Sequence, residues 1–108
     1  LLTKNGGKVA MITSLMGSID DCHSGKSYAY RASKTALNML ATSIKNELRD
    51  QGVSVVLIHP GWVETDMGRP RAPLGVEESV AGILARIEEQ TLDSSGRFVD
   101  YEGEALPW

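Results

Sequence analysis

Two short, nearly continuous apolar runs constrain the fold of this chain more than any other feature. The first spans residues 7–14 (GKVAMITS) and the second spans residues 53–59 (VSVVLIH), and both are rich in residues that favour strands. Runs of this length without polar alternation are typical of strands that are buried on both faces, as in parallel sheets. The sequence therefore predicts two buried strands at these positions.

A helical pattern fills the interval between the two runs. From Ser27 to Asp50 apolar residues recur at steps of three and four, and Gly52 follows as a stop signal. A strand, a long helix and a second strand in this order predict a parallel pair with a right-handed connection. A further helical pattern over residues 76–89 is expected to pack on the sheet. We therefore expect an α/β fold.

Tyr30 and Lys34 stand four residues apart near the start of the long helical pattern, so their side chains share one face of the helix. A nearby ammonium favours the phenolate form of a tyrosine, which then can pass a proton near neutral pH. This spacing is common, and taken alone it favours a half-buried helix tyrosine beside a solvated lysine. The surrounding segments decide between the two interpretations.

Three segments are expected to meet at the carboxyl edge of the predicted sheet, where ligands bind in folds of this kind. Ser14 closes the first strand, Tyr30 opens the helix, and the second strand runs into Pro60-Gly61 and on to Thr65. Gly61 would let the backbone approach a ligand closely, and Thr65 offers a hydroxyl and exposed amides. His59, at the end of the second strand, is interpreted as a satisfied core or rim histidine rather than as a catalyst.

The ordered set of Ser14, Tyr30 with Lys34, and Pro60-Gly61 with Thr65 resembles the short-chain dehydrogenase/reductase family. The resemblance covers essentially the whole chain, since residues 96–101 (GRFVDY) are similar to the last strand of that family. It is strongest to the sniffer and C-factor-like branch of carbonyl reductases. The fold it implies is the C-terminal part of a Rossmann-like, doubly wound parallel sheet.

The resemblance implies hydride transfer between a nicotinamide and a small carbonyl or alcohol substrate. Tyr30 would be the acid–base residue, Ser14 would bond the substrate oxygen, and Lys34 would assist Tyr30 and bond the nicotinamide ribose. Val63 and Thr65 would hold the carboxamide. The implied cofactor-binding set is Tyr30, Lys34, Pro60, Gly61, Val63 and Thr65. The cofactor is expected to be NADP, with NAD possible, and the protein to be a monomer or a homodimer.

The main departure from the family is the absence of its Gly-rich cofactor-binding motif. That motif cradles a pyrophosphate at a helix N-terminus, and the glycines of this chain never form it. We therefore expect residues 1–108 to be the C-terminal half of one dinucleotide-binding reductase domain, inactive by itself. Two alternatives to a reductase stay open. One is an incomplete half-reductase that acts in binding or signalling, and the other is a nucleotide-sugar epimerase, a class that also uses a tyrosine and a lysine four residues apart.

Composition limits the other function classes. The net charge of −3 argues against nucleic acid as a partner, and the longest apolar run is too short to span a membrane. A single cysteine fits a reducing compartment, so a cytoplasmic location is expected. The polar segment 20–26 (DDCHSGK) could be interpreted as metal ligands, but a solvated loop at the substrate mouth is favoured. Residues 68–75 could form a substrate lid or a plain surface connection.

Overall fold

The computed structural model describes residues 7–62 and 75–108. Within these ranges the strands are β1 (Gly7–Ile12), β2 (Val53–His59) and β3 (Arg97–Asp100), and the long helices are α2 (Tyr28–Leu48) and α3 (Val76–Glu89). Two 3₁₀ turns, η1 (Leu15–Gly17) and η2 (Arg49–Gln51), follow β1 and α2. No helix in these ranges is both long and apolar enough to cross a membrane.

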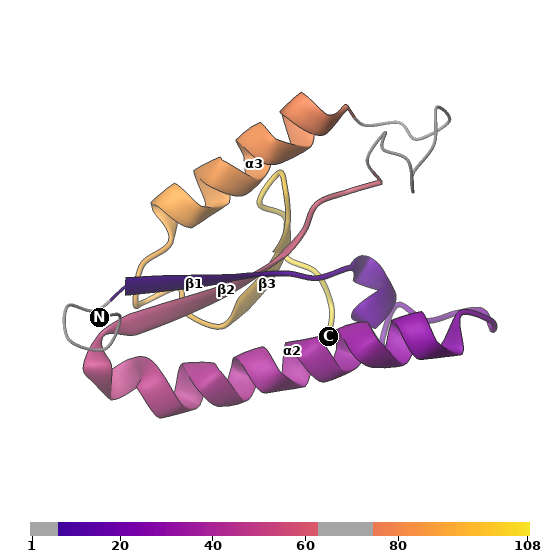
Figure 1. Ribbon diagram of the computed structural model, residues 1–108, viewed down its shortest axis with the longest axis horizontal. Helices are drawn as coiled ribbons and strands as arrows, with labels where there is room; N and C mark the ends of the chain where they lie inside the picture. The colour runs from indigo at the N-terminus through magenta and orange to yellow at the C-terminus, as the bar shows by residue number, and fades with distance from the viewer. Residues whose placement is uncertain (1–6, 63–74) are drawn as a thin grey trace.

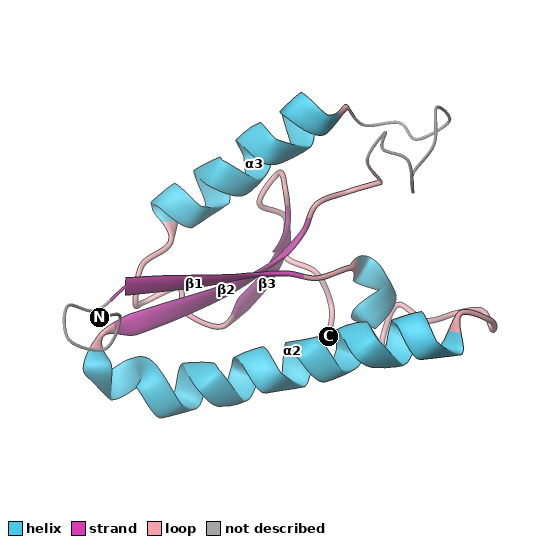
Figure 2. Cartoon of the chain, viewed as in Figure 1, coloured by secondary structure: helices cyan, strands magenta, loops and turns pink. Residues whose placement is uncertain are grey.

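The strands form one parallel sheet in the order β1-β2-β3, with Val9 opposite Val55 and Ile58 opposite Val99. Helix α2 covers one face of this sheet and α3 covers the other (Figures 1 and 2). The α/β fold with parallel strands, predicted from the order of the apolar runs, is therefore confirmed.

The two crossover connections have opposite hands. Both step in the same direction across the sheet, yet their helices lie on opposite faces (Figure 1). The connection through α2 is right-handed, as predicted, and the connection through α3 is consequently left-handed, which is rare for parallel strands. As a result, α2 and α3 together cover both faces of the sheet at β2.

Strand β2 is the central strand of the sheet, and its successive side chains pack alternately into two hydrophobic clusters, one on each face. Val55 and Leu57 pack with Ala41 of α2, whereas Val56 and Ile58 pack with α3. All four side chains are fully buried. The prediction of a strand buried on both faces is confirmed for residues 53–59.

The same prediction is wrong for the first run. Strand β1 is only partly buried, and Ile12 keeps 44 % of its surface exposed. The reason is its place at the edge of the sheet, because no described strand pairs with its outer side. The strand also ends at Ile12, since Ser14 already turns the chain into η1.

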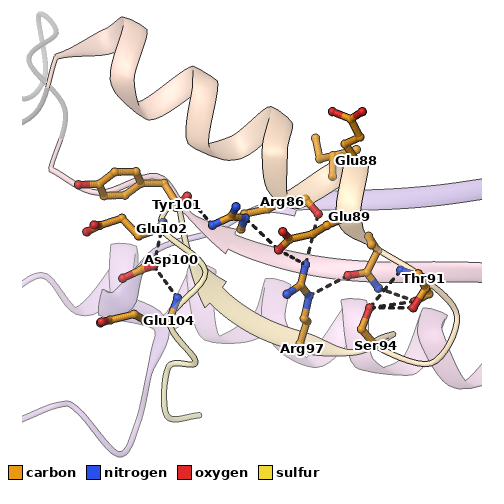
Figure 3. Close-up of polar contacts among 12 residues, drawn as sticks. Arg86, Glu88, Glu89, Thr91, Ser94, Arg97, Asp100, Tyr101, Glu102 and Glu104 are labelled. Carbon is orange, nitrogen blue, oxygen red and sulfur yellow. Dashed lines mark hydrogen bonds and ion pairs between the residues drawn. The ribbon is translucent and has the colours of Figure 1, made fainter.

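A polar network fastens α3 to the amino-terminal end of β3 (Figure 3). Glu89 lies 3.0 Å from both Arg86 and Arg97, and Arg97 Nε donates to Gln90 Oε1 at 2.9 Å. Lys8 donates to carbonyl oxygens of the last turn of α3. This network lies at the amino edge of the sheet, whereas ligands of open α/β sheets bind at the carboxyl edge.

Candidate functional site

Ser14 lies where β1 turns into η1, with only 7 % of its surface exposed. Its Oγ accepts a hydrogen bond from the Met16 amide at 3.0 Å. The neighbouring Thr13 amide donates to the carbonyl oxygen of Ile58 at 2.9 Å, which extends the pairing of β1 and β2 by one residue. Because Oγ is used as an acceptor, the hydroxyl proton of Ser14 is free to be donated to a ligand.

The η1 turn is held tightly against α2. A Cβ on Gly17 would come within 2.9 Å of the backbone carbon and Cβ of Lys34, so only glycine fits without a shift. Thr35 Oγ1 donates to the Gly17 carbonyl oxygen at 2.9 Å, and Thr13 Oγ1 donates to Asn38 Oδ1 at 2.7 Å. Ser14 is thereby fixed relative to the helix that bears Tyr30 and Lys34.

Tyr30 and Lys34 lie on the same face of α2, as their spacing predicts. The Lys34 ammonium nitrogen is 5.7 Å from the centre of the Tyr30 ring. It also donates a long hydrogen bond, 3.4 Å, to the carbonyl oxygen of Ile12. Tyr30 keeps 42 % of its surface exposed and is accessible to a ligand.

A hollow of about 560 Å³ opens between η1, the start of α2 and the end of β2. Ser14, Tyr30, His59 and Gly61 all line it. Lys34 approaches Tyr30 but is not part of the lining. Pro60 is held in place by Ser79 of α3, whose Oγ donates to the Pro60 carbonyl oxygen at 2.7 Å. Val63, Thr65 and most of the segment 68–75 lie outside the described residues.

His59, expected to be a satisfied core or rim histidine, makes a specific contact with the serine turn. Its Nδ1 accepts a hydrogen bond from the Leu15 amide at 3.2 Å, directly after Ser14 in the chain. Burial lowers the pKa of His59 below its usual value near 6.5, and the Asp100 carboxylate partly opposes this shift. Because a nitrogen that accepts carries no proton, this hydrogen bond requires a neutral imidazole with its proton on Nε2. A histidine ending a buried strand just before Pro60 was the available sequence signal.

Residues of the loop between η1 and α2 line the hollow. Asp21, His23 and Ser24 line it, together with Trp62 and with Arg31 of α2. Arg31 donates to Ser24 Oγ at 3.2 Å. Sequence reasoning missed Arg31 and Trp62 as lining residues. Within the described ranges, no group of three or more potential metal ligands gathers.

The hollow fits a nicotinamide with its ribose. Its volume falls inside the range of small-molecule sites, about 300–1,000 Å³. In the described part of the chain Lys34 forms no ion pair, so its ammonium keeps hydrogen-bond donors that a ligand beside Tyr30 could use. Gly61 has a φ of 86°, and its lack of a side chain lets backbone approach a ligand.

The comparison with protein families decides the affiliation of this site. The model of the family described as short chain dehydrogenase matches residues 1–73, more than half of the chain. The chain belongs to the short-chain dehydrogenase family. The ordered residues Ser14, Tyr30 and Lys34, on which the resemblance was based, fall within the matched part.

Curated relatives match nearly the whole of this chain. It is 50 % identical to the C-signal of Myxococcus xanthus over 94 % of the chain and 61 % of that protein. It is 39 % identical to the 1-hydroxy-2-glutathionyl-2-methyl-3-butene dehydrogenase of a Rhodococcus species, over 99 % of the chain and 49 % of that protein. The chain thus spans roughly half the length of the curated relatives it matches.

Solved structures agree with the fold. The carbonyl reductase Sniffer of D. melanogaster superimposes with a TM-score of 0.89 and 40 % identity, over 94 % of this chain and 41 % of that one. The NADPH-bound carbonyl reductase from chicken fatty liver superimposes with a TM-score of 0.85 and 37 % identity, over 94 % and 42 %. The predicted affiliation with the sniffer and C-factor-like branch is confirmed, as is the Rossmann-like parallel sheet.

Proposed function

We propose that this protein is an NADP-dependent oxidoreductase that reduces a small carbonyl compound or oxidises the corresponding alcohol. The observation that carries the proposal is that Ser14 and Tyr30 line the same hollow, with the Lys34 ammonium beside the Tyr30 ring. The family supports an oxidoreductase, and the similar chicken enzyme is named as NADPH-bound. NAD stays an alternative cofactor.

Tyr30 and Ser14 would act together on the oxygen of the substrate. Ser14 Oγ–H, oriented by the bond that Oγ accepts from the Met16 amide, donates to the carbonyl oxygen and polarises it. Tyr30 donates its phenolic proton to the same oxygen as the carbonyl becomes an alcohol. When bound, the nicotinamide supplies the hydride that reaches the carbonyl carbon.

Lys34 and the loop after β2 would serve the cofactor and the proton transfer. The Lys34 ammonium stabilises the negative charge that develops on Tyr30 and donates to the ribose hydroxyls. Pro60 and Gly61 would form the cofactor-side wall of the hollow, and Val63 and Thr65 would hold the carboxamide. The proposed substrate is a small molecule, and the free, exposed Cys22 suits a cytoplasmic setting.

We further propose that residues 1–108 form the C-terminal half of one dinucleotide-binding domain. The outer edge of β1 has no partner strand among the described residues, and unpaired edges of parallel sheets are normally covered. The longer length of the curated relatives agrees with this proposal. The missing phosphate cradle would then come from the preceding half.

A second candidate is a binding or signalling role without turnover. The observation that favours it is the 50 % identity to a protein named C-signal. The two functions differ in a simple way, because a binding role does not require the phenolic hydroxyl of Tyr30. The following experiment therefore separates them.

The full-length protein is assayed with NADPH and a panel of aldehydes and ketones, as wild type and as Tyr30→Phe. Loss of the general acid should lower kcat by about 10²–10⁴-fold while the binding of NADPH stays nearly intact. Tyr28→Phe is the matched control, since Tyr28 is 80 % exposed and does not line the hollow. Equal turnover by Tyr30→Phe and wild type refutes the acid role, and absence of turnover in wild type favours the binding role.

A further inference from the structure

We propose that His59 is a positioning residue, which holds the Ser14 turn in its working geometry only while its imidazole is neutral. The inference rests on the proposed function for its kinetic consequences. The hydrogen bond on which it is built is a feature of the fold and can be tested without turnover.

The backbone amides of η1 need acceptors from outside the turn, and His59 supplies one of them. The Gly17 amide donates to the Ser14 carbonyl oxygen at 2.9 Å, and the Met16 amide donates to Ser14 Oγ at 3.0 Å. The Leu15 amide, which precedes both, donates to His59 Nδ1 at 3.2 Å. The imidazole thus ties the residue directly after Ser14 to the end of β2.

This bond also joins two segments that line the hollow. His59 is followed at once by Pro60 and Gly61, the proposed cofactor-side wall, while Leu15 directly follows Ser14. Together with the backbone bond from Thr13 to Ile58, the His59 side chain therefore ties the serine turn to the cofactor-side loop. Small displacements of reacting groups change rates strongly, because attack and proton transfer require close alignment.

The bond depends on protonation. A neutral imidazole with its proton on Nε2 accepts at Nδ1, whereas the imidazolium donates at both nitrogens and cannot accept from the Leu15 amide. Burial lowers the pKa of His59, so the accepting form persists at neutral pH. Acidification below about 6.5 eventually protonates it and removes the bond.

Other titratable groups face the same region from the neighbouring elements. They are Asp100 of β3, Asp21 and His23 of the outer loop, and Tyr30 and Arg31 of α2. Asp100 raises the pKa of His59, but burial outweighs it. From α3, the side chain that bonds this loop is the uncharged Ser79. His59 and His23 are the two histidines of the sequence, so a matched control is available.

The kinetic experiment compares pH profiles of kcat for the full-length wild type, His59→Asn, His59→Leu and His23→Asn. Asparagine can place Oδ1 where Nδ1 stood and does not titrate, so His59→Asn should keep neutral activity and lose the acidic fall in kcat. His59→Leu removes the acceptor and should lower kcat about 10- to 100-fold at every pH, with the Kd for NADPH unchanged. His23→Asn should keep the acidic fall.

Two kinetic results overturn the proposal. One is a His59→Leu variant with the kcat and pH profile of the wild type. The other is an acidic fall that persists in His59→Asn but disappears in His23→Asn, since His23 would then be the titrating group.

The second measurement is independent of turnover and of whether His59→Leu folds. Nitrogen NMR of ¹⁵N-histidine-labelled full-length protein, with the His23→Asn variant for assignment, reports the tautomer of His59. The proposal requires the Nε2–H tautomer and a protonation midpoint below about 6.5. An Nδ1–H tautomer at neutral pH overturns it even in an active enzyme. The required tautomer in a protein without carbonyl turnover upholds the bond and places the failure in the proposed function.

Discussion

The close approach of η1 to α2 can be tested by giving Gly17 a side chain. In Gly17→Ala the new Cβ would lie 2.9 Å from both the backbone carbon and the Cβ of Lys34 and 3.1 Å from the Lys34 oxygen. Ordinary van der Waals contact begins near 3.4 Å, so η1 and α2 must separate by about half an ångström or more. The clash is mainly with helix backbone, which cannot rotate away.

The expected magnitude follows from two opposing effects. Overpacking a well-packed contact costs about 1–3 kcal/mol. Replacing glycine by alanine returns about 0.4–1 kcal/mol by reducing the freedom of the unfolded chain, because Gly17 does not have a positive φ. We therefore expect a net loss of about 1–2 kcal/mol in the free energy of unfolding. Separation of η1 from α2 should also displace Ser14 from Tyr30 and lower kcat.

Urea denaturation of the full-length protein measures the loss of stability. The rate of carbonyl reduction reports the displacement of Ser14 from Tyr30. Gly75→Ala is the matched control, since its Cβ would meet nothing within 4 Å and its φ is −76°. That control should change stability by less than about 0.5 kcal/mol. A Gly17→Ala protein as stable as the Gly75→Ala protein would refute the reasoning, because the contact between η1 and the Lys34 backbone could not then be as close as described.

Two further outcomes are expected. Thr13→Val removes the hydroxyl that donates to Asn38 Oδ1, a bond between two buried side chains, and should lower the free energy of unfolding, measured in urea, by about 1–3 kcal/mol. Thr42→Val loses only a bond to a carbonyl oxygen of its own helix and should lower it by less. The free energy of unfolding should also fall as the pH drops below about 6.5, because His59 binds a proton more readily in the unfolded chain than in the folded protein, where it is partly buried. Urea midpoints at several pH values measure this fall. The part that is due to His59 should vanish in His59→Asn.

Much of the fold was predictable from the sequence because its strands and helices carry local patterns. The apolar run at residues 53–59 and the helical pattern at 76–89 coincide with β2 and α3, and the long helix differs from its prediction only at its ends. The spacing of Tyr30 and Lys34 also determined that they share a face, since helical periodicity is a local property.

The apolar pattern of residues 7–14, taken alone, predicted the burial of the first strand wrongly. An apolar run does not indicate how many strands and helices will pack against it. Strand β1 is partly exposed because it lies at the edge of the described sheet. The opposite hands of the two crossovers were equally inaccessible, because the side of the sheet that a helix takes is decided by packing between distant segments.

The sequence by itself therefore determined the element types, their parallel order and the ordered serine, tyrosine and lysine of the candidate site. Only the tertiary structure decided that the Leu15 amide meets His59 Nδ1, that Gly17 packs on the Lys34 backbone, and which outer-loop residues line the hollow. The physical reason is distance along the chain. Residues 15 and 59 are 44 positions apart, and local periodicity carries no information about a contact that forms only when the sheet assembles.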